Sequence, residues 1–301
     1  MSRNRGGGYN EPMKIKTDDY RIREGDVIHL DKLPTRVKPL YDGADHYETL
    51  MRTHTERLSQ LQETLYAARH YALLLVFQAM DAAGKDGTIK HVLSGINPEG
   101  VDVTSFKQPS ATELSHDFLW RTYQKLPERG RIGVFNRSYY EEVLIVRVHP
   151  ELLTAQNLPP EFIKDKEIWE DRFRSINTME KHLVRNGTHV LKFFLHLSKD
   201  EQRRRFLGRL DTPAKNWKFS AADVTERKYW KQYQSAYEDC LRETSTKEAP
   251  WYAIPADDKE NARLLVSQVV LETMEGLHQT FPQTDAAHKQ ELLSMRESLA
   301  G

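Results

Sequence analysis

The chain has 301 residues, of which 39% are hydrophobic and 29% charged, so we expect a substantial buried core and exclude an intrinsically disordered protein. Lys plus Arg equals Asp plus Glu at 44 each, and this balance gives no global field for a nucleic acid or membrane partner. The single cysteine, Cys240, excludes an internal disulfide framework and indicates a cytoplasmic location.

The chain begins with a polar segment, which is followed by a helical pattern and then by an apolar run. Residues 1–40 are polar and irregular, and we interpret them as an N-terminal arm that either wraps the domain or is partly disordered. Residues 41–301 are expected to form a single domain, which opens with a helical pattern over 45–69. The continuous apolar run 71–77 then favours a strand that is buried on both faces of a parallel sheet.

Similar short apolar runs recur along the chain and alternate with helical stretches. They lie at 101–106, 131–135, 189–197 and 251–256. Strands that alternate with helices predict an α/β fold, here a doubly wound parallel sheet flanked by helices.

The later helices carry recognisable start and stop signals. Ser198 with Glu201, Ser220 with Asp223, and Asp257 with Glu260 have capping spacing, and they predict helices through 210, 242 and 278. Gly187 is placed to end a helix over 160–186. The polar tail after Pro282 is expected to be a short helix or a frayed end.

The segment after the first predicted strand resembles a P-loop. The pattern G-x-x-x-x-G-K-[ST] is matched at Gly84-Lys85, whereas Ala79 replaces the first glycine and Asp86 replaces the hydroxyl residue. Backbone N–H groups and the helix dipole at such a turn favour an anion. We therefore predict a phosphate site formed by Ala82, Ala83, Gly84, Lys85, Asp86 and Gly87. The alternative is a turn that needs glycine for its geometry alone.

A second polar cluster follows the third predicted strand. Asn136 stands where P-loop enzymes carry a metal-binding Asp, and Glu141 can restore the missing charge. Arg137 can neutralise a transferring phosphoryl group. Asp81 or Asp86 can supply the oxygen that the missing hydroxyl would give to magnesium. The alternative is a helix cap with a solvated face.

These two clusters define the predicted catalytic and metal-binding residues. The candidate catalytic residues are Asp81, Lys85, Asn136, Arg137 and Glu141. The candidate ligands of Mg²⁺, with Mn²⁺ as the substitute, are Asn136, Glu141 and either Asp81 or Asp86.

Basic residues gather after the fourth predicted strand. Eight of them lie between Arg203 and Lys228, and Gly208 and Pro213 mark a loop between two helices. We predict a mobile basic lid over about 199–230, which would exclude water from a phosphoryl-transfer site. The alternative is an ordinary solvated helix face. Lys107 follows the second predicted strand, where it either reaches the same sheet edge or is a plain surface lysine.

Four motifs together resemble the polyphosphate kinase 2 family over about residues 40–280. They are Met80-Asp-Ala-Ala-Gly-Lys-Asp-Gly87, Thr104-Ser-Phe-Lys107, Val134-Phe-Asn-Arg-Ser-Tyr-Tyr-Glu141 and Asn216-Trp-Lys-Phe-Ser220. The resemblance implies a thymidylate-kinase-like P-loop fold with a helical lid. It also implies magnesium-dependent transfer of the terminal phosphoryl group of inorganic polyphosphate to a nucleotide.

The resemblance assigns roles residue by residue. Asp81 matches the family's magnesium and catalytic carboxylate, Lys85 its P-loop lysine, and Arg137 the arginine after its Walker-B-like strand. With Asp81 chosen in this way, the expected metal set is Asp81, Asn136 and Glu141. The lid residues that grip polyphosphate match Arg204, Lys215 and Lys218, with Arg204 drawn from three adjacent arginines.

Asn136 departs from the Asp of many members and is similar to the subgroup called class III, which accepts AMP as well as ADP. This departure leaves open whether Glu141 takes part in holding magnesium. The partners implied are polyphosphate and AMP, ADP or ATP, with guanine nucleotides as further candidates, in a homodimer or homotetramer.

Two other functions fit parts of the same pattern. An ATP-dependent kinase of a nucleotide or small metabolite would share the fold and most of the loop chemistry. A non-catalytic protein that binds polyanions would retain the basic residues without turnover. The scattered histidines give no nucleophile with a local activating partner, so we expect direct in-line transfer without a covalent intermediate.

Overall fold

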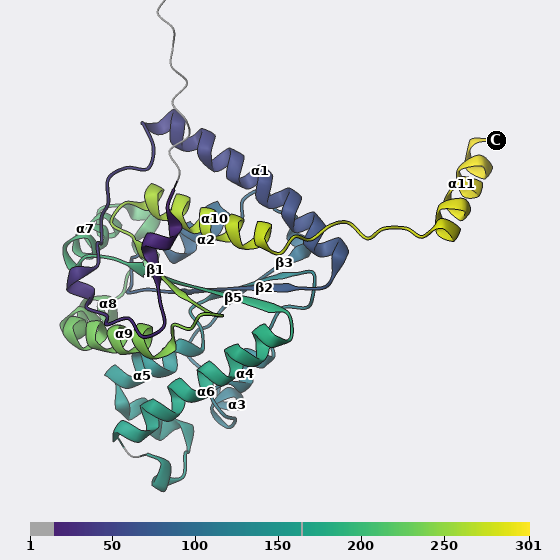
Figure 1. Cartoon of the computed structure of the whole chain (residues 1–301). Helices are drawn as coiled ribbons and strands as arrows, with labels where there is room; N and C mark the ends of the chain where they lie inside the picture. Colours follow the sequence, from purple (N-terminus) through teal and green to yellow (C-terminus); the bar gives the residue numbers. More distant parts are fainter. Residues whose placement is uncertain (1–14, 164) are drawn as a thin grey trace, which may run out of the picture.

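The computed structural model describes residues 15–163 and 165–301 and centres on one six-stranded sheet (Figure 1). The strand order is β1-β6-β5-β2-β4-β3, and every pair is parallel except β1 with β6. The strands are β1 (Arg21–Ile22), β2 (Ala72–Gln78), β3 (Val101–Ser105), β4 (Ile132–Asn136), β5 (Thr188–His196) and β6 (Trp251–Pro255). The predicted α/β fold with a parallel sheet is confirmed.

Helices cover both faces of this sheet. They are α1 (Ala44–Ala68), α2 (Lys85–Val92), α3 (Ala111–Leu114), α4 (Trp120–Tyr123), α5 (Ile145–Val148), α6 (Asp165–Arg185), α7 (Lys199–Leu210), α8 (Ala221–Glu226), α9 (Trp230–Thr244), α10 (Lys259–Gly276) and α11 (Ala286–Ala300). In Figure 1, α1, α2 and α10 lie on one face, and α5, α6 and α9 lie on the other. No helix of the described residues has the length and apolarity to cross a membrane.

The central strand β2 supplies side chains to both layers of the core. Leu73 and Leu75 pack with α1, α2 and α10, whereas Leu74 and Val76 pack with α6 and α9. All seven residues of β2 are buried. This is why the sequence run is continuously apolar instead of alternating.

The strand order changes direction at β2, so the carboxyl end of β2 is a topological switch point. The chain leaves β2 for β3 and β4 on one side, and later adds β5 and β6 on the other. Ligands of open parallel sheets bind at such a switch point, outside the carboxyl ends of the strands. The P-loop-like segment begins directly after β2 at this point.

The structure corrects two local predictions. The single helix predicted over 220–242 is wrong: α8 ends at Glu226, a 3-10 turn covers Arg227–Tyr229, and α9 starts at Trp230. The break has a packing reason, because Tyr229 and Trp230 pack against the core whereas α8 has no buried residue. The predicted cap of α10 is also displaced, since Asp258, not Asp257, accepts from the first N–H groups of that helix.

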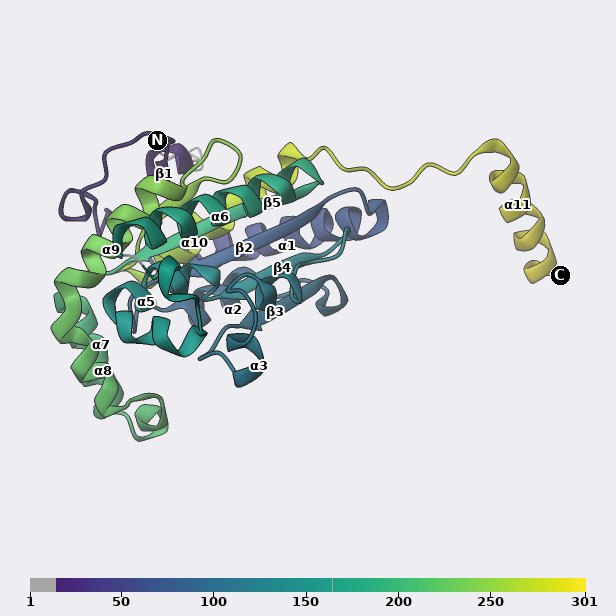
Figure 2. The same cartoon turned by 90° about the horizontal axis from the view of Figure 1, so that it is seen from below.

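The N-terminal end of the described chain packs against the sheet and its helices, whereas the C-terminal helix does not. Residues 15–40 run along the body, pair as β1 with β6, and bury Ile22, Ile28 and Leu30 in the core. Helix α11 instead stands away from the body on an extended segment (Figures 1 and 2). The sequence pattern gave no sign of β1, because two residues are too few for a period. The division into residues 1–40 and 41–301 stays a prediction.

Candidate active site

The loop between β2 and α2 has the backbone of an anion-binding turn. Gly84 caps α2 with a φ of 101°, a left-handed conformation that suits glycine. Ala82 has a φ of 65°, which an alanine rarely adopts. Non-glycine residues in this region cost free energy and concentrate at functional sites. This backbone is consistent with an anion-binding loop, and the phosphate site itself stays a prediction.

Lys85 opens α2 and turns back over the loop. Its Nζ donates to the backbone oxygen of Ala79 at 2.9 Å. Burial lowers the pKa of Lys85, with Asp81 acting in the opposite direction. The ammonium group is therefore held in the loop by a single carbonyl hydrogen bond, with donors left for an incoming oxygen.

The end of β4 lies beside the loop because Asn136 pairs in register with Phe77 of β2. Arg137 follows with a left-handed φ of 61°, and its N–H donates to Phe77 O at 3.0 Å. Its guanidinium contacts Asp81 Oδ1 at 3.2 Å. Asn136 Nδ2 donates to Asp86 Oδ1 at 2.6 Å. The two polar clusters of the sequence are thus one site in the structure.

Electrostatics keep Arg137 charged. Burial alone would lower its pKa, but the neighbouring carboxylates of Glu141 and Asp81 outweigh burial, so the pKa of Arg137 is raised. A permanent cation is therefore fixed between two acidic groups at the end of the sheet.

Glu141 is held by a residue that the sequence analysis overlooked. Gln78, the last residue of β2, donates from Nε2 to Glu141 Oε1 at 2.9 Å. Its own Oε1 is buried and has no hydrogen-bond partner among the described residues. Only its position at the end of a buried apolar run could have singled it out.

This donor set fits a hard divalent cation. Three carboxylates (Asp81, Asp86 and Glu141) face two cations, so the site carries a net negative charge of about one and would repel a polyanion by itself. The unpaired Gln78 oxygen adds a neutral acceptor, and magnesium prefers oxygen ligands and water.

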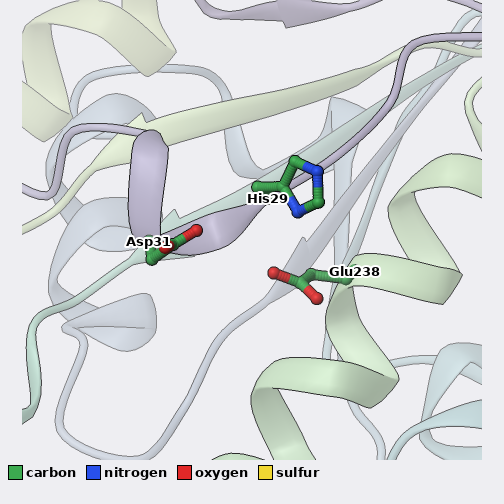
Figure 3. Close-up of side chains that lie close together, drawn as sticks. All are labelled: His29, Asp31 and Glu238. Carbon is green, nitrogen blue, oxygen red and sulfur yellow. The ribbon is translucent and has the colours of Figure 1, made fainter.

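A separate group of metal-type ligands lies on other elements. His29 and Asp31, in the arm, approach Glu238 of α9 with ligand atoms within 4.8 Å of one another (Figure 3). Glu238 Oε1 already accepts from the N–H of Leu30 at 2.7 Å. We interpret this cluster as an attachment of the arm to α9, and none of its members was predicted as a ligand.

The predicted lid residues are spread over an exposed projection that contains α7, the 3-10 turn Pro213–Lys218 and α8 (Figure 2). Arg204 is 73% exposed and pairs with Glu201 at 2.6 Å. Lys215 is exposed, and the side chain of Lys218 lies outside the described residues. Lys107 is exposed after β3. The side chains of Lys107, Arg204 and Lys215 do not contact the loop within the part of the chain described.

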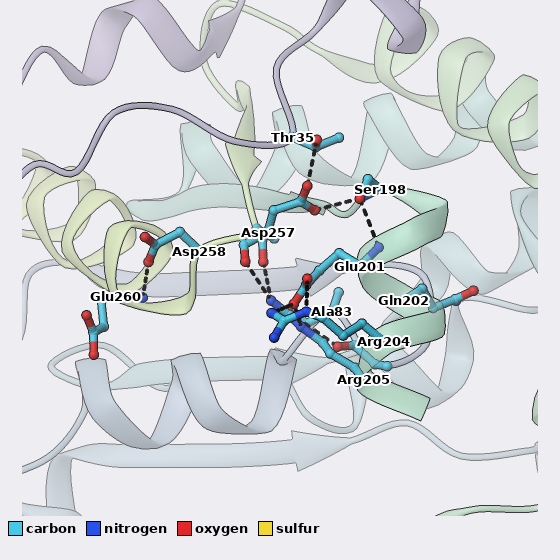
Figure 4. A network of polar contacts seen from close by, with 12 residues as sticks. Thr35, Ala83, Ser198, Glu201, Gln202, Arg204, Arg205, Asp257, Asp258 and Glu260 are labelled. Carbon is cyan, nitrogen blue, oxygen red and sulfur yellow. Dashed lines mark hydrogen bonds and ion pairs between the residues drawn. The ribbon is translucent and has the colours of Figure 1, made fainter. Parts of the chain in front are cut away.

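The adjacent arginine is the one that reaches the loop. The Arg205 side chain is 8% exposed, and its Nη1 donates to the carbonyl oxygens of Ala82 and Ala83 (Figure 4). Gln202, one turn earlier, donates to Asp81 O. The helical period from the Ser198 cap could have indicated them, since Gln202, Arg205 and Phe206 share the inward face.

Comparisons with known proteins point to one family. A family model described as polyphosphate kinase 2 matches residues 42–282. The chain is 63% identical over 287 residues to an ADP-polyphosphate phosphotransferase of Rhodopseudomonas palustris, covering 95% of this chain and 99% of the relative. It is 49% identical to an AMP/ADP-polyphosphate phosphotransferase of Meiothermus ruber, covering 89% and 96%. The crystal structure of a polyphosphate kinase 2 from Arthrobacter aurescens TC1 superposes with a TM-score of 0.84 at 38% identity, covering 95% of this chain and 99% of that one.

Proposed function

Because the chain belongs to the polyphosphate kinase 2 family, we propose that the loop after β2 is where it transfers the terminal phosphoryl group of polyphosphate to a nucleotide. The enzyme is a polyphosphate-dependent kinase that phosphorylates ADP. AMP is the second acceptor that we propose, because the relative from Meiothermus ruber is named for both nucleotides.

The observation that carries the site assignment is the contact between Asp81 and Arg137 beside the left-handed loop. It joins the P-loop-like segment and the end of β4, which the sequence separates by more than fifty residues. Both segments lie within the part of the chain that matches the family.

The protein's own groups act by position and charge. Lys85 binds oxygens of the phosphate chain that do not react, and Arg137 stabilises charge on the transferring group. The loop N–H groups orient the terminal phosphate. Transfer is in line between two phosphate oxygens, so no side chain needs to form a covalent bond with the phosphoryl group.

Magnesium belongs to this proposal. Asp81 would hold it, with Asn136 and Glu141 as the further ligands, and it would offset the surplus negative charge when polyphosphate binds. Manganese can replace it in an oxygen-ligand site of this kind. Acceptance of guanine nucleotides, a homodimeric or homotetrameric state, a cytoplasmic location and the polyphosphate-gripping lid remain predictions.

An assay of acceptors and cation tests the function. Long-chain polyphosphate is incubated with AMP, ADP or GDP, with magnesium or with excess EDTA, and the products are separated by chromatography. We expect ATP from ADP, ADP followed by ATP from AMP, and no product in EDTA. Phosphorylation that requires ATP as donor and ignores polyphosphate would contradict the proposal.

A further inference from the structure

Three successive carbonyl groups of the loop accept hydrogen bonds from the same helix, α7. Gln202 Nε2 donates to Asp81 O at 2.9 Å, and Arg205 Nη1 donates to Ala82 O at 3.0 Å and Ala83 O at 2.8 Å. Both side chains are shielded, Gln202 fully and Arg205 almost fully. Shielded bonds of this kind are stronger than the same bonds in water. The carbonyl side of the loop is therefore held against α7 by hydrogen bonds.

Peptide geometry then sets where the loop N–H groups point. All peptide bonds of the described residues are trans, so each carbonyl is opposed by the N–H of the next residue. The N–H groups of Ala82, Ala83 and Gly84 consequently point away from α7. That of Ala83 donates to Met80 O at 3.3 Å. Those of Ala82 and Gly84 have no acceptor within the described ranges, which leaves them available to an anion.

We propose that Gln202 and Arg205 are positioning residues that set the anion-binding face of the loop. By holding three carbonyl oxygens on the α7 side, they keep the partial negative charges away from the phosphate and present the N–H groups to it. Neither residue touches the reacting atoms in this assignment. The identity of the anion as polyphosphate rests on the proposed function; the control of the loop geometry does not.

Arg205 is itself fixed from the opposite side. Its Nη2 donates to the carbonyl oxygens of Ala256 at 2.6 Å and Asp257 at 3.3 Å (Figure 4). The Asp257 carboxylate accepts from the N–H of Ser198 at 2.8 Å and from Thr35 Oγ1 at 2.9 Å. The end of β6, the start of α7 and the arm thus hold one guanidinium against the loop. This explains why Asp257 is not the cap of α10.

A lysine would not replace this arginine. The planar guanidinium reaches Ala82, Ala83, Ala256 and Asp257 together, whereas an ammonium group is a point charge with three donors. We therefore expect the loop of the Arg205→Lys variant to be as loose as that of Arg205→Ala, and looser than that of the unchanged protein.

The test measures the loop directly. Amide hydrogen exchange of the full chain is followed by mass spectrometry for Arg205→Ala, Arg205→Lys and Gln202→Leu. Arg203→Ala, an exposed arginine of the same helix, is the charge-matched control. We expect the hydrogen-bonded N–H of Ala83, followed in the peptide spanning 79–86, to exchange about tenfold faster in both Arg205 variants and at an unchanged rate in the control, because a hydrogen bond from a charged group contributes roughly that factor or more.

Anion binding and turnover give the second readout. Inorganic tripolyphosphate, titrated by calorimetry, should bind the Arg205 variants about tenfold to a hundredfold more weakly. The KM for polyphosphate should rise with the KM for ADP little changed, a split that general loss of structure would not produce. Added guanidinium ion should restore part of the Arg205→Ala affinity and leave Arg205→Lys as it is.

The outcomes separate this inference from the proposed function. Equal loop exchange in Arg205→Ala and the unchanged protein, or an increase spread over the whole chain, would overturn the positioning role. If Arg205→Ala does not fold, Gln202→Leu and Arg205→Lys decide by the same measurement. An unchanged protein that fails to use polyphosphate would end the proposed function, while the exchange result would still judge the positioning role.

Discussion

Two lysines of this protein lie beside carboxylates, and they differ in burial and in the number of donors that are satisfied. Lys192, on β5, is completely buried, and its three donors reach Glu180 at 2.6 Å, Tyr140 Oη at 3.0 Å and Thr244 O at 2.6 Å. Lys85 has one hydrogen bond, to Ala79 O, and lies among carboxylates that remain partly accessible. The first lysine has every donor satisfied, whereas the second has donors to spare.

The same contrast holds for the acids. The Glu180 carboxylate accepts from Tyr139 and Tyr140 at 2.7 Å each and from Lys192, so its charge is enclosed and paired. The loop site instead has more carboxylates than cations. Burial lowers the pKa of Lys192 against the opposing effect of Glu180, and no ligand can reach the pair. The enclosed and fully paired cluster around Lys192 suits a structural role, whereas the accessible loop cluster, with its excess of carboxylates, has the charge pattern of the cation site that we propose.

The largest expected effect separates the two regions by activity. Asp81→Asn and Lys85→Ala should each lower polyphosphate-driven ATP formation by about three orders of magnitude, because the first removes the carboxylate that would hold magnesium and the second removes a cation that stabilises the transition state. The thermal unfolding midpoint should change little, since both groups are partly accessible. Lys90→Ala, an exposed lysine of α2, is the control. Near-normal turnover in both site variants would end the assignment.

The buried pair should show the reverse pattern, in stability. Lys192→Met leaves Glu180 uncompensated, and removing one partner of a buried ion pair costs about 3–5 kcal/mol. Lys192→Met combined with Glu180→Gln should recover part of this loss, because no buried charge is then left unpaired. Denaturant unfolding of Lys192→Met, Glu180→Gln and the double variant measures the difference. A double variant that is as unstable as the sum of its single changes would contradict the pairing.

A smaller effect should appear as a pH dependence of stability. Burial lowers the pKa of His54 and His189 from the usual 6.5, so the folded protein holds both rings neutral where the unfolded chain protonates them. Stability should therefore rise with pH through the range just below about 6.5 and fall as pH is lowered through it. Thermal unfolding between pH 5 and 7 measures this slope, and His189→Gln should flatten it. If the slope of stability against pH is the same in that variant, His189 does not cause the pH dependence.

The smallest effect concerns Cys240, which is buried beside the Lys192 cluster. Burial raises its pKa to about 12, so the reactive thiolate is scarce at neutral pH. A thiol reagent should leave the native protein unmodified and fully active while it labels the chain rapidly in denaturant. Fast labelling of the native protein at pH 7.5, with loss of activity, would show that this region opens.

The sequence predicted which residues lie together at the site better than it predicted the bounds of individual helices. The spacing of Gly84-Lys85 after an apolar run and the polar residues after the β4 run predicted two clusters at one sheet edge, and Asp81 and Arg137 do lie in contact. Their roles in catalysis stay predictions. The helix over 220–242 was wrong because propensity and caps are local, whereas the turn at Arg227–Tyr229 follows from core packing.

By itself, the sequence determined the parallel α/β arrangement and the place of a P-loop-like motif after a buried strand, because apolar periodicity and short motifs are properties of neighbouring residues. Only the tertiary structure decided which of three adjacent arginines faces the loop, why Asp257 does not cap α10, and how β1 closes the sheet edge. Those outcomes depend on which carbonyl oxygens and N–H groups the fold leaves within hydrogen-bond reach, and no pattern of neighbouring residues encodes that.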